Sequence, residues 1–248
     1  MNDIEYQVKK ANKDFYDVVG ASYEEIDGRR SEQLINYVVD QLNMLSKNTD
    51  ADSILDLGCG SGFISRTARN LFRKRYAADL SFQIVNAIDD NTIQKLTADV
   101  DSIPVKDEKI SSVVTFAVLH HCYSYDKMIT EIHRILKTGG IFYSDHDMDS
   151  LFFKRFKLLL KLYRMINDAS KRYLSRFNEL SEQVYKCSEY HQNGIHSKEI
   201  ENILKTIGFS NVKIQYHWYG LSPLTDKIFG RKTYKRGYAP LVKIIAVK

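Results

Sequence analysis

The 248-residue sequence is poor in cysteine, proline and tryptophan, with three, three and one of these residues. Its cysteines, Cys59, Cys122 and Cys187, are odd in number and lack C-x-x-C spacing, which argues against a disulfide framework and a zinc site. No stretch approaches the roughly 18 consecutive apolar residues of a membrane-spanning helix. The segment Met1–Glu5 lacks the basic and apolar regions of a secretory signal. We therefore expect a protein that holds no metal and works in the reducing cytoplasm.

The remaining composition is that of a globular protein, with 44% hydrophobic and 27% charged residues. This apolar content is ample for a core and excludes disorder as the main state. The net charge is +5, but Leu151 to Cys187 alone has nine Lys or Arg against three Asp or Glu, a surplus of six. Such a basic stretch suits an anionic substrate, a membrane surface or nucleic acid, or it is the solvated face of a helix.

Apolar runs alternate with helical patterns along the first 145 residues. After helices expected at 2–20 and 31–45, the predicted strands are 53–57, 75–79, 92–98, 110–117 and 141–144, and the predicted intervening helices are 63–72, 81–88 and 126–136. The last of these helices is expected to stop at Gly139-Gly140. Strands that alternate with helices in this way predict an α/β fold with a parallel sheet covered on both faces.

The alternation stops after Asp145. Residues 147–195 show helical patterns without a clear strand, and a helix at 197–206 and strands at 211–218 and 241–247 follow. We therefore predict a core of residues 1–146 and 196–248 and a helical insertion of residues 147–195. A helix over 152–166 would place apolar side chains on one face and basic ones on the other: Phe152, Phe156, Leu159, Tyr163 and Ile166 against Lys154, Lys157, Lys161 and Arg164. This helix either packs on the domain or forms a lid over the carboxyl ends of the strands.

A glycine-rich segment, Asp56-Leu57-Gly58-Cys59-Gly60-Ser61-Gly62, joins the first predicted strand to the next helix. Glycines let the backbone turn sharply and let a ligand approach without meeting a Cβ. The spacing is G-x-G-x-G rather than the G-x-G-x-x-G of nicotinamide enzymes. Asp56 before the first glycine would repel a pyrophosphate but can accept hydrogen bonds from a cationic or neutral ligand.

Two further acids end the next two predicted strands. Asp79 can accept both ribose hydroxyls of an adenosine. Asp99 can accept from the exocyclic amine of adenine, while the backbone N–H of the next residue reads a ring nitrogen. Each acid alone would be an ordinary turn residue. Their order after the glycine loop favours an adenosine site.

With these motifs the sequence resembles the class I S-adenosylmethionine-dependent methyltransferases, specifically the small-molecule group that includes ubiquinone and sterol methyltransferases. The resemblance extends to the segments 99–105, 118–121, 136–140 and 204–209. It implies a Rossmann-like sheet of seven strands, mostly parallel with an antiparallel last strand, and helices on both faces. It also implies S-adenosylmethionine as cofactor and S-adenosylhomocysteine as product.

The resemblance assigns cofactor-binding roles by position. The glycine loop would lie near the methionine part, the two acids would hold ribose and adenine, and N-terminal residues would cover the cofactor, with Arg30 on the methionine carboxylate. The predicted cofactor-binding residues are Tyr16, Tyr23, Arg30, Asp56, Gly58, Cys59, Gly60, Asp79, Leu80, Asp99, Val100, Phe116 and Ala117.

Two histidines after the fourth strand, His120 and His121, are the candidates for a catalytic base, because imidazole titrates near neutral pH. They could equally be loop histidines that bond backbone groups. Further pocket candidates are Tyr123, Asp145, His146, Tyr190 and His191. The expected reaction is methyl transfer to an O, N or C atom of a small acceptor, amphipathic or anionic in character.

Of three alternatives to a small-molecule methyltransferase, two are disfavoured and one remains open. The sequence lacks the Asn-Pro-Pro-Tyr, Asp-Pro-Pro-Tyr and Pro-Cys motifs of DNA methyltransferases, so DNA is not an expected partner. A nicotinamide-dependent oxidoreductase is disfavoured by Asp56 and the glycine spacing. A non-catalytic protein that binds an adenosyl ligand and acts at a membrane surface or on RNA through the basic helix remains an alternative. The oligomeric state is not predicted.

Overall fold

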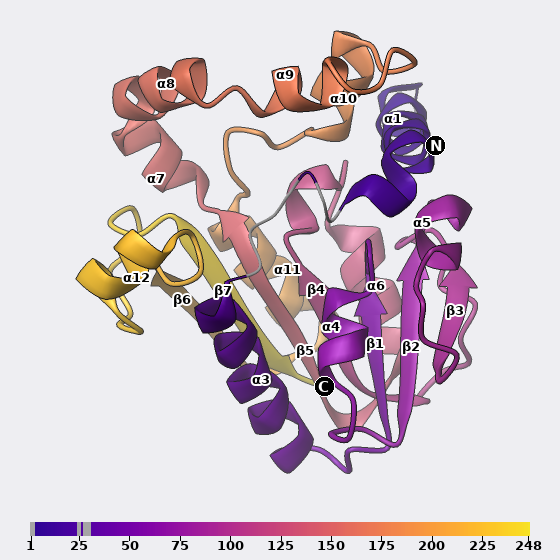
Figure 1. Ribbon diagram of the computed structural model, residues 1–248. Coiled ribbons are helices and arrows are strands. Elements are labelled where there is room, and N and C mark those ends of the chain that lie inside the picture. Colours follow the sequence, from indigo (N-terminus) through magenta and orange to yellow (C-terminus); the bar gives the residue numbers. More distant parts are fainter. Residues whose placement is uncertain (1–2, 24–25, 27–30) are drawn as a thin grey trace.

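The computed structural model describes residues 3–23, 26 and 31–248 (Figure 1). Arg30, a predicted cofactor-binding residue, therefore lies outside the described residues. Among the helices described, none combines the length and the apolar composition needed to span a membrane.

A seven-stranded sheet runs through the centre of the described chain, in the order β3-β2-β1-β4-β5-β7-β6. The neighbours from β3 to β5 pair in parallel, and β7 pairs antiparallel with both β5 and β6. This confirms the predicted sheet with its antiparallel last strand. The strands are β1 Ser53–Leu57, β2 Lys74–Asp79, β3 Ile93–Thr97, β4 Ile110–Phe116, β5 Leu136–Met148, β6 Ser210–His217 and β7 Leu241–Val247.

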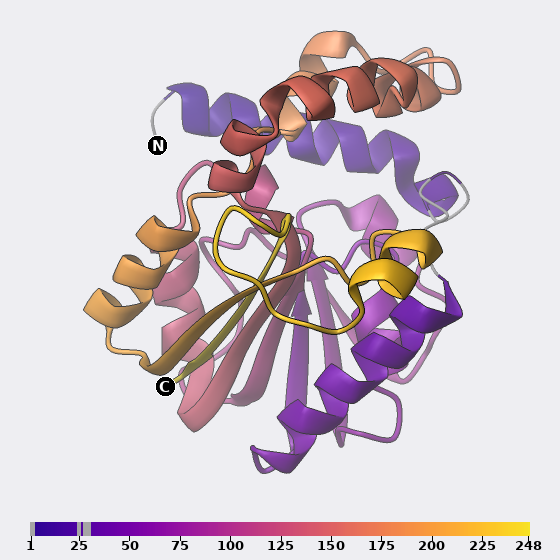
Figure 2. The ribbon, with the colours of Figure 1, turned by 90° about the vertical axis from the view of Figure 1, so that its left-hand side faces the viewer.

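Helices cover both faces of the sheet, as predicted (Figures 1 and 2). On one face, α6 (Asp126–Ile135) and α11 (Ser197–Ile207) bury apolar side chains against the inner strands. On the other, α3 (Glu32–Lys47), α4 (Phe63–Thr67) and α5 (Phe82–Asn86) do the same. Because side chains alternate along a strand, the doubly buried β1 and β4 supply both cores.

A roof of helices lies over the carboxyl ends of the parallel strands (Figure 1). It consists of α1 (Asp3–Val19), the short η1 (Gly20–Ser22), and the insertion helices α7 (Ser150–Arg155), α8 (Lys157–Ile166), α9 (Ala169–Leu174) and α10 (Glu182–Ser188). An apolar cluster that includes Phe15, Val19, Tyr173 and Leu180 joins α1 to the insertion. This position corresponds to the lid that was one of the two interpretations of the basic helix.

The predicted helix over 152–166 is wrong in two respects. It breaks at Phe156 into α7 and α8. Phe152 is buried, but Leu159, Tyr163 and Ile166 are 64%, 62% and 83% exposed, so the apolar face of α8 points to solvent rather than into the domain.

Several boundaries also differ from the predictions. The helix expected at 63–72 ends at Thr67 and the one at 81–88 ends at Asn86. Leu136 does not end a helix but begins β5, where it pairs with Ile110. The Gly139-Gly140 pair lies inside β5 because it exchanges backbone hydrogen bonds with Lys248. The connection between β6 and β7 contains α12 (Pro223–Phe229), which was not predicted; Ser222 caps it and Pro223 occupies its first turn.

Candidate cofactor and acceptor site

The glycine loop follows β1 in a conformation that other residues rarely adopt. Gly58 and Gly60 have φ of +70° and +49°. A Cβ on Gly58 would lie 2.7 Å from Val118 Cγ2, whereas one on Gly60 would meet no atom closer than 3.9 Å. The backbone N–H groups of Gly58 and Cys59 both donate to the Ala78 carbonyl oxygen, which ties the loop to β2. The loop thus packs against Val118, just after β4, at Gly58 and leaves open space at Gly60.

Asp56 is 1% exposed at the end of β1. Its Oδ2 accepts a hydrogen bond from the Ser65 backbone N–H at 2.9 Å, which holds the start of α4 against the loop. The residue also lines the cavity described below. The bond gives Asp56 a structural role that the sequence did not predict.

Asp79 at the end of β2 is joined directly to the glycine loop. Its Oδ2 accepts from the Gly60 N–H at 3.0 Å, and its Oδ1 accepts from the Ser81 N–H at 3.1 Å. Burial raises the pKa of Asp79, although these backbone hydrogen bonds oppose the rise. Each carboxylate oxygen has a second lone pair available for a ligand hydroxyl.

Asp99, after β3, is paired with a residue that sequence reasoning missed. Lys9 of α1 donates from Nζ to Asp99 Oδ2 at 2.7 Å and to Asp101 Oδ2 at 2.6 Å. Burial alone would lower the pKa of Lys9, but the hydrogen bonds to the two acids raise it above its usual value. Lys9 is one of several lysines on an amphipathic helix, so the sequence offers no signal that singles it out.

One cavity of about 400 Å³ brings the predicted residues together. Asp79 and Asp99 both line it, so the two acids share one hollow rather than lying on different rims. Every predicted cofactor or catalytic residue in the described part of the chain also lines it: Tyr16, Tyr23, Asp56, Gly58, Cys59, Gly60, Asp79, Leu80, Asp99, Val100, Phe116, Ala117, His120 and His121. Their individual roles remain predictions.

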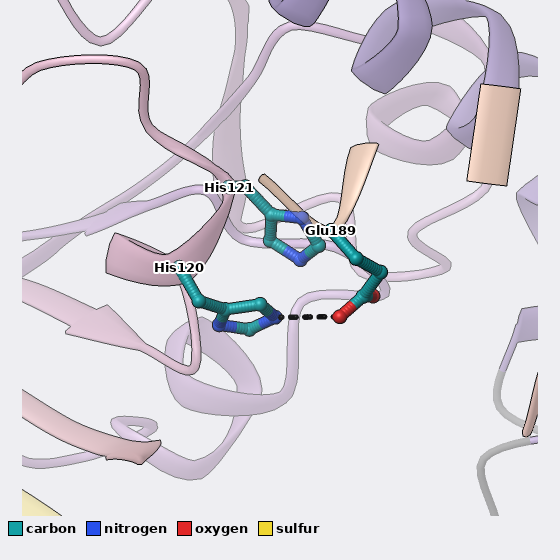
Figure 3. A group of neighbouring side chains, drawn as sticks. All are labelled: His120, His121 and Glu189. Atoms are coloured by element: carbon teal, nitrogen blue, oxygen red, sulfur yellow. Dashed lines mark ion pairs between the residues drawn. The ribbon is translucent and has the colours of Figure 1, made fainter. Parts of the chain in front are cut away.

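His120 belongs to η2 (Leu119–His121), directly after β4, and is oriented by a buried carboxylate. Its Nδ1 lies 2.7 Å from Oδ1 of Asp147, which is 1% exposed and also accepts from the backbone N–H groups of Leu119 and His120. Because the carboxylate can only accept, Nδ1 carries the proton and Nε2 is the basic nitrogen of the neutral ring. His120 Nε2 lies 3.6 Å from Oε2 of Glu189 (Figure 3).

His121 has both ring nitrogens engaged. Its Nδ1 donates to the Ser188 carbonyl oxygen at 2.6 Å, so Nε2 accepts from the Tyr16 hydroxyl at 3.0 Å. Burial, together with the neighbouring His120, lowers the pKa of His121 to about 4, so the ring is neutral at pH 7. His120, His121 and Glu189 offer ligand atoms within 4.8 Å of one another, which makes them a candidate metal group as well as an acid–base group.

The remaining pocket candidates divide into two groups. Tyr123, His146 and His191 line the cavity, but Asp145 and Tyr190 do not. Asp145 was wrong as a pocket residue because it is fully buried, where it accepts hydrogen bonds from Tyr37, Tyr143 and His217. Although burial opposes ionisation, the adjacent His217 and His146 hold the pKa of Asp145 well below its usual range.

Sequence reasoning also missed residues of the roof and of β5 that belong to the site. Asp147 orients His120 without lining the cavity, and it carries a weak sequence signal because it lies near the carboxyl end of β5 as Asp79 lies at the end of β2. Glu189, Arg164 and Gln192 come from the insertion and line the cavity without any motif to mark them. Arg164 donates to the Gln192 carbonyl oxygen and forms no ion pair with a carboxylate of the described residues.

Part of the sequence matches a known protein family. Residues 55–144 match a family described as "Methyltransferase domain". Malonyl-[acyl-carrier protein] O-methyltransferase of Hamiltonella defensa is 27% identical over 141 residues, which cover 56% of this chain and 52% of the relative. The chain thus spans about half the length of that relative. An uncharacterized protein of Methanocaldococcus jannaschii is 21% identical over 98% of this chain and 93% of its own length.

Solved structures share the fold. Magnesium protoporphyrin IX methyltransferase from Synechocystis, with bound S-adenosylhomocysteine, superposes with a TM-score of 0.58 at 16% identity, covering 97% of this chain and 99% of its own. A SAM-dependent methyltransferase from Aquifex aeolicus gives 0.53 at 14% identity, covering 90% and 96%. Residues 55–144 therefore form a methyltransferase domain, the chain has the fold of class I S-adenosylmethionine-dependent methyltransferases, and S-adenosylmethionine is the cofactor of that domain.

Proposed function

We propose that this protein transfers a methyl group from S-adenosylmethionine to a small-molecule acceptor held beside His120. The observation that carries the proposal is the single cavity, in which the glycine loop, Asp79 and Asp99 face the same space as His120. The cofactor residues and the base candidate are therefore close enough for one reaction centre.

The residues present fit the cofactor. Asp79 retains two acceptor sites for ribose hydroxyls after its backbone hydrogen bonds are counted. Asp99 presents a carboxylate for the adenine amine, and the open space over Gly60 lets a ligand approach the backbone. S-adenosylmethionine, when bound, supplies a methyl group on a positively charged sulfur, which needs an aligned nucleophile.

The Asp147–His120 pair supports an acceptor that must lose a proton. Asp147 holds the proton on Nδ1, so Nε2 is the basic nitrogen of this cavity-lining residue and would take the acceptor's proton during attack. The resulting imidazolium would lie between Asp147 and Glu189, whose carboxylates stabilise its charge. This arrangement favours a hydroxyl acceptor over a carboxylate, because a carboxylate needs no base.

The acceptor class is proposed from the cavity lining and from the relatives. Arg164 brings to the cavity a guanidinium that has no carboxylate ion-pair partner among the described residues, which suits an acceptor with a carboxylate or phosphate group. Two of the similar proteins are named for malonyl-[acyl-carrier protein] and magnesium protoporphyrin IX rather than for DNA. The compartment proposed is the cytoplasm, since all three cysteines are free thiols.

The test combines binding with methyl transfer. Calorimetry should show saturable binding of S-adenosylhomocysteine, and label from [methyl-³H]S-adenosylmethionine should pass to a member of a panel of anionic phenols and alcohols. His120→Asn keeps a donor near Asp147 but lacks the Nε2 base, so it should bind S-adenosylhomocysteine normally and lose about 100-fold or more of the transfer rate.

Two outcomes would contradict this proposal. Absence of S-adenosylhomocysteine binding would remove the cofactor site. The second outcome is methyl transfer that EDTA abolishes and a divalent ion restores. It would indicate that His120, His121 and Glu189 bind a metal, and it would refute the role of His120 as a base.

A further inference from the structure

Helix α8 carries the largest concentration of exposed apolar side chains on the described surface. No residue of the helix is buried. Six of its ten residues are large apolar side chains that are 57–83% exposed: Leu158, Leu159, Leu162, Tyr163, Met165 and Ile166. A contiguous apolar face of this kind on a water-soluble surface indicates a site for a partner.

The helix is oriented with its apolar face outward. At 100° per residue the six side chains cover one side of α8, whereas Leu160 and Arg164 lie on the other. Arg164 faces the protein, where it donates to the Gln192 carbonyl oxygen and lies over the Phe153 ring at 5.0 Å. Figures 1 and 2 show α8 at the outer edge of the roof, away from the sheet. Rotation of α8 to bury its apolar side would therefore remove Arg164 from the cavity.

The surroundings of this face are basic. Residues 150–167 contain five Lys or Arg and no Asp or Glu. Lys154, Lys157 and Lys161 are exposed and form no ion pair with any residue that the structure describes. The complement of the whole surface is therefore a partner that is apolar at its centre and anionic at its edge.

We propose that α8 binds the surface of an anionic lipid bilayer, with its apolar side chains at the acyl boundary and its lysines at the headgroup phosphates. This is the arrangement of an interfacial amphipathic helix. A second copy of the chain fits less well, because pairing two α8 helices would bring four lysines together, Lys157 and Lys161 of each copy.

The experiment is vesicle sedimentation with the full chain. Vesicles of phosphatidylcholine with about 30% phosphatidylglycerol should bind the protein at least tenfold more tightly than pure phosphatidylcholine, and salt should weaken the binding. Leu158→Ser with Leu162→Ser should reduce the partition coefficient at least tenfold. Lys161→Gln, at the edge of the apolar face, should reduce it about fivefold, because each lysine near an anionic surface contributes one attracted charge.

A matched control comes from α12, whose Leu224 is 67% exposed outside this face. Leu224→Ser should leave vesicle binding unchanged. All variants change exposed side chains, so their melting temperatures and their affinities for S-adenosylhomocysteine should equal those of the wild type. The proposal is overturned if the wild type stays in the supernatant, if the α8 variants bind like the wild type, or if light scattering shows a dimer that these variants dissociate.

Discussion

Asp79→Asn is the sharpest test of the cofactor site, because the structure specifies what each oxygen of this carboxylate does. One oxygen accepts from Gly60 and the other from Ser81. The ribose hydroxyls are expected to use the remaining lone pair of each. An asparagine retains one acceptor oxygen, and its NH₂ group can satisfy neither a backbone N–H nor a hydroxyl that needs an acceptor.

The expected magnitudes follow from this count. Loss of one charge-assisted hydrogen bond to the ribose costs about 1.5–3 kcal/mol, or roughly 10- to 100-fold in the dissociation constant for S-adenosylhomocysteine. Loss of one backbone hydrogen bond lowers the free energy of unfolding by about 1 kcal/mol, the lower end of the usual range. The lower end applies because burial disfavours the ionised carboxylate of Asp79. The neutral asparagine avoids this desolvation cost, which offsets part of the lost hydrogen bond.

Calorimetric titration with S-adenosylhomocysteine and thermal unfolding without it separate the two effects. Asp52→Asn makes the same change of charge at the amino end of the sheet, where Asp52 pairs with Arg73 and Lys137. It should leave the affinity within about twofold of wild type. If Asp79→Asn also binds S-adenosylhomocysteine with wild-type affinity, the assignment of this carboxylate to the ribose is wrong.

Four other substitutions have defined outcomes. Lys9→Met removes the ammonium group that Asp99 and Asp101 share, and it should lower the free energy of unfolding by about 1–3 kcal/mol. Amide hydrogen exchange should become faster in α1 alone. An unchanged exchange rate in α1 would contradict this prediction. Gly60→Ala should lower the free energy of unfolding by the roughly 1–2 kcal/mol that a left-handed backbone costs an alanine. Gly58→Ala should lower it by more, because its Cβ would also meet Val118. Equal melting temperatures of the two variants would refute the contact with Val118. The lowered pKa of His121 means that the unfolded state takes up a proton below about pH 6.5 while the folded state does not, so stability falls from pH 7 to pH 5 by up to about 2 kcal/mol. Denaturant unfolding at both pH values should show a smaller fall for His121→Asn, and an equal fall would count against a buried neutral ring.

The sequence predicted the sheet, and it predicted which residues gather around the glycine loop, because both follow local rules. Carboxyl ends of parallel strands gather at one edge, so Asp79 and Asp99 had to lie near the glycine loop once the strands were recognised. The prediction of strand boundaries was less accurate where glycine was interpreted as the end of a helix. Gly139 lies within β5 because a partner more than 100 residues away, Lys248, completes its hydrogen bonds.

The acceptor side was not predictable in the same way. His120 was identified by type, but its partners Asp147 and Glu189 come from β5 and from the insertion, and only the tertiary structure brings them together. Helical periodicity separated the two faces of α8 correctly. It could not say which face points inward, because that depends on the few contacts of Arg164 and its neighbours.

The hydrogen bond from Lys9 to Asp99 links the N-terminal helix to the residue that is predicted to bind the adenine amine. A base amine that bonds to Asp99 must share or displace the ammonium group that attaches α1 to the domain. Binding of a nucleoside at Asp99 should therefore change how often α1 detaches from the domain. Because thermodynamic coupling is reciprocal, the attachment of α1 should change the affinity for the nucleoside by the same factor. The first helix would then be a thermodynamic participant in ligand exchange rather than a passive cover.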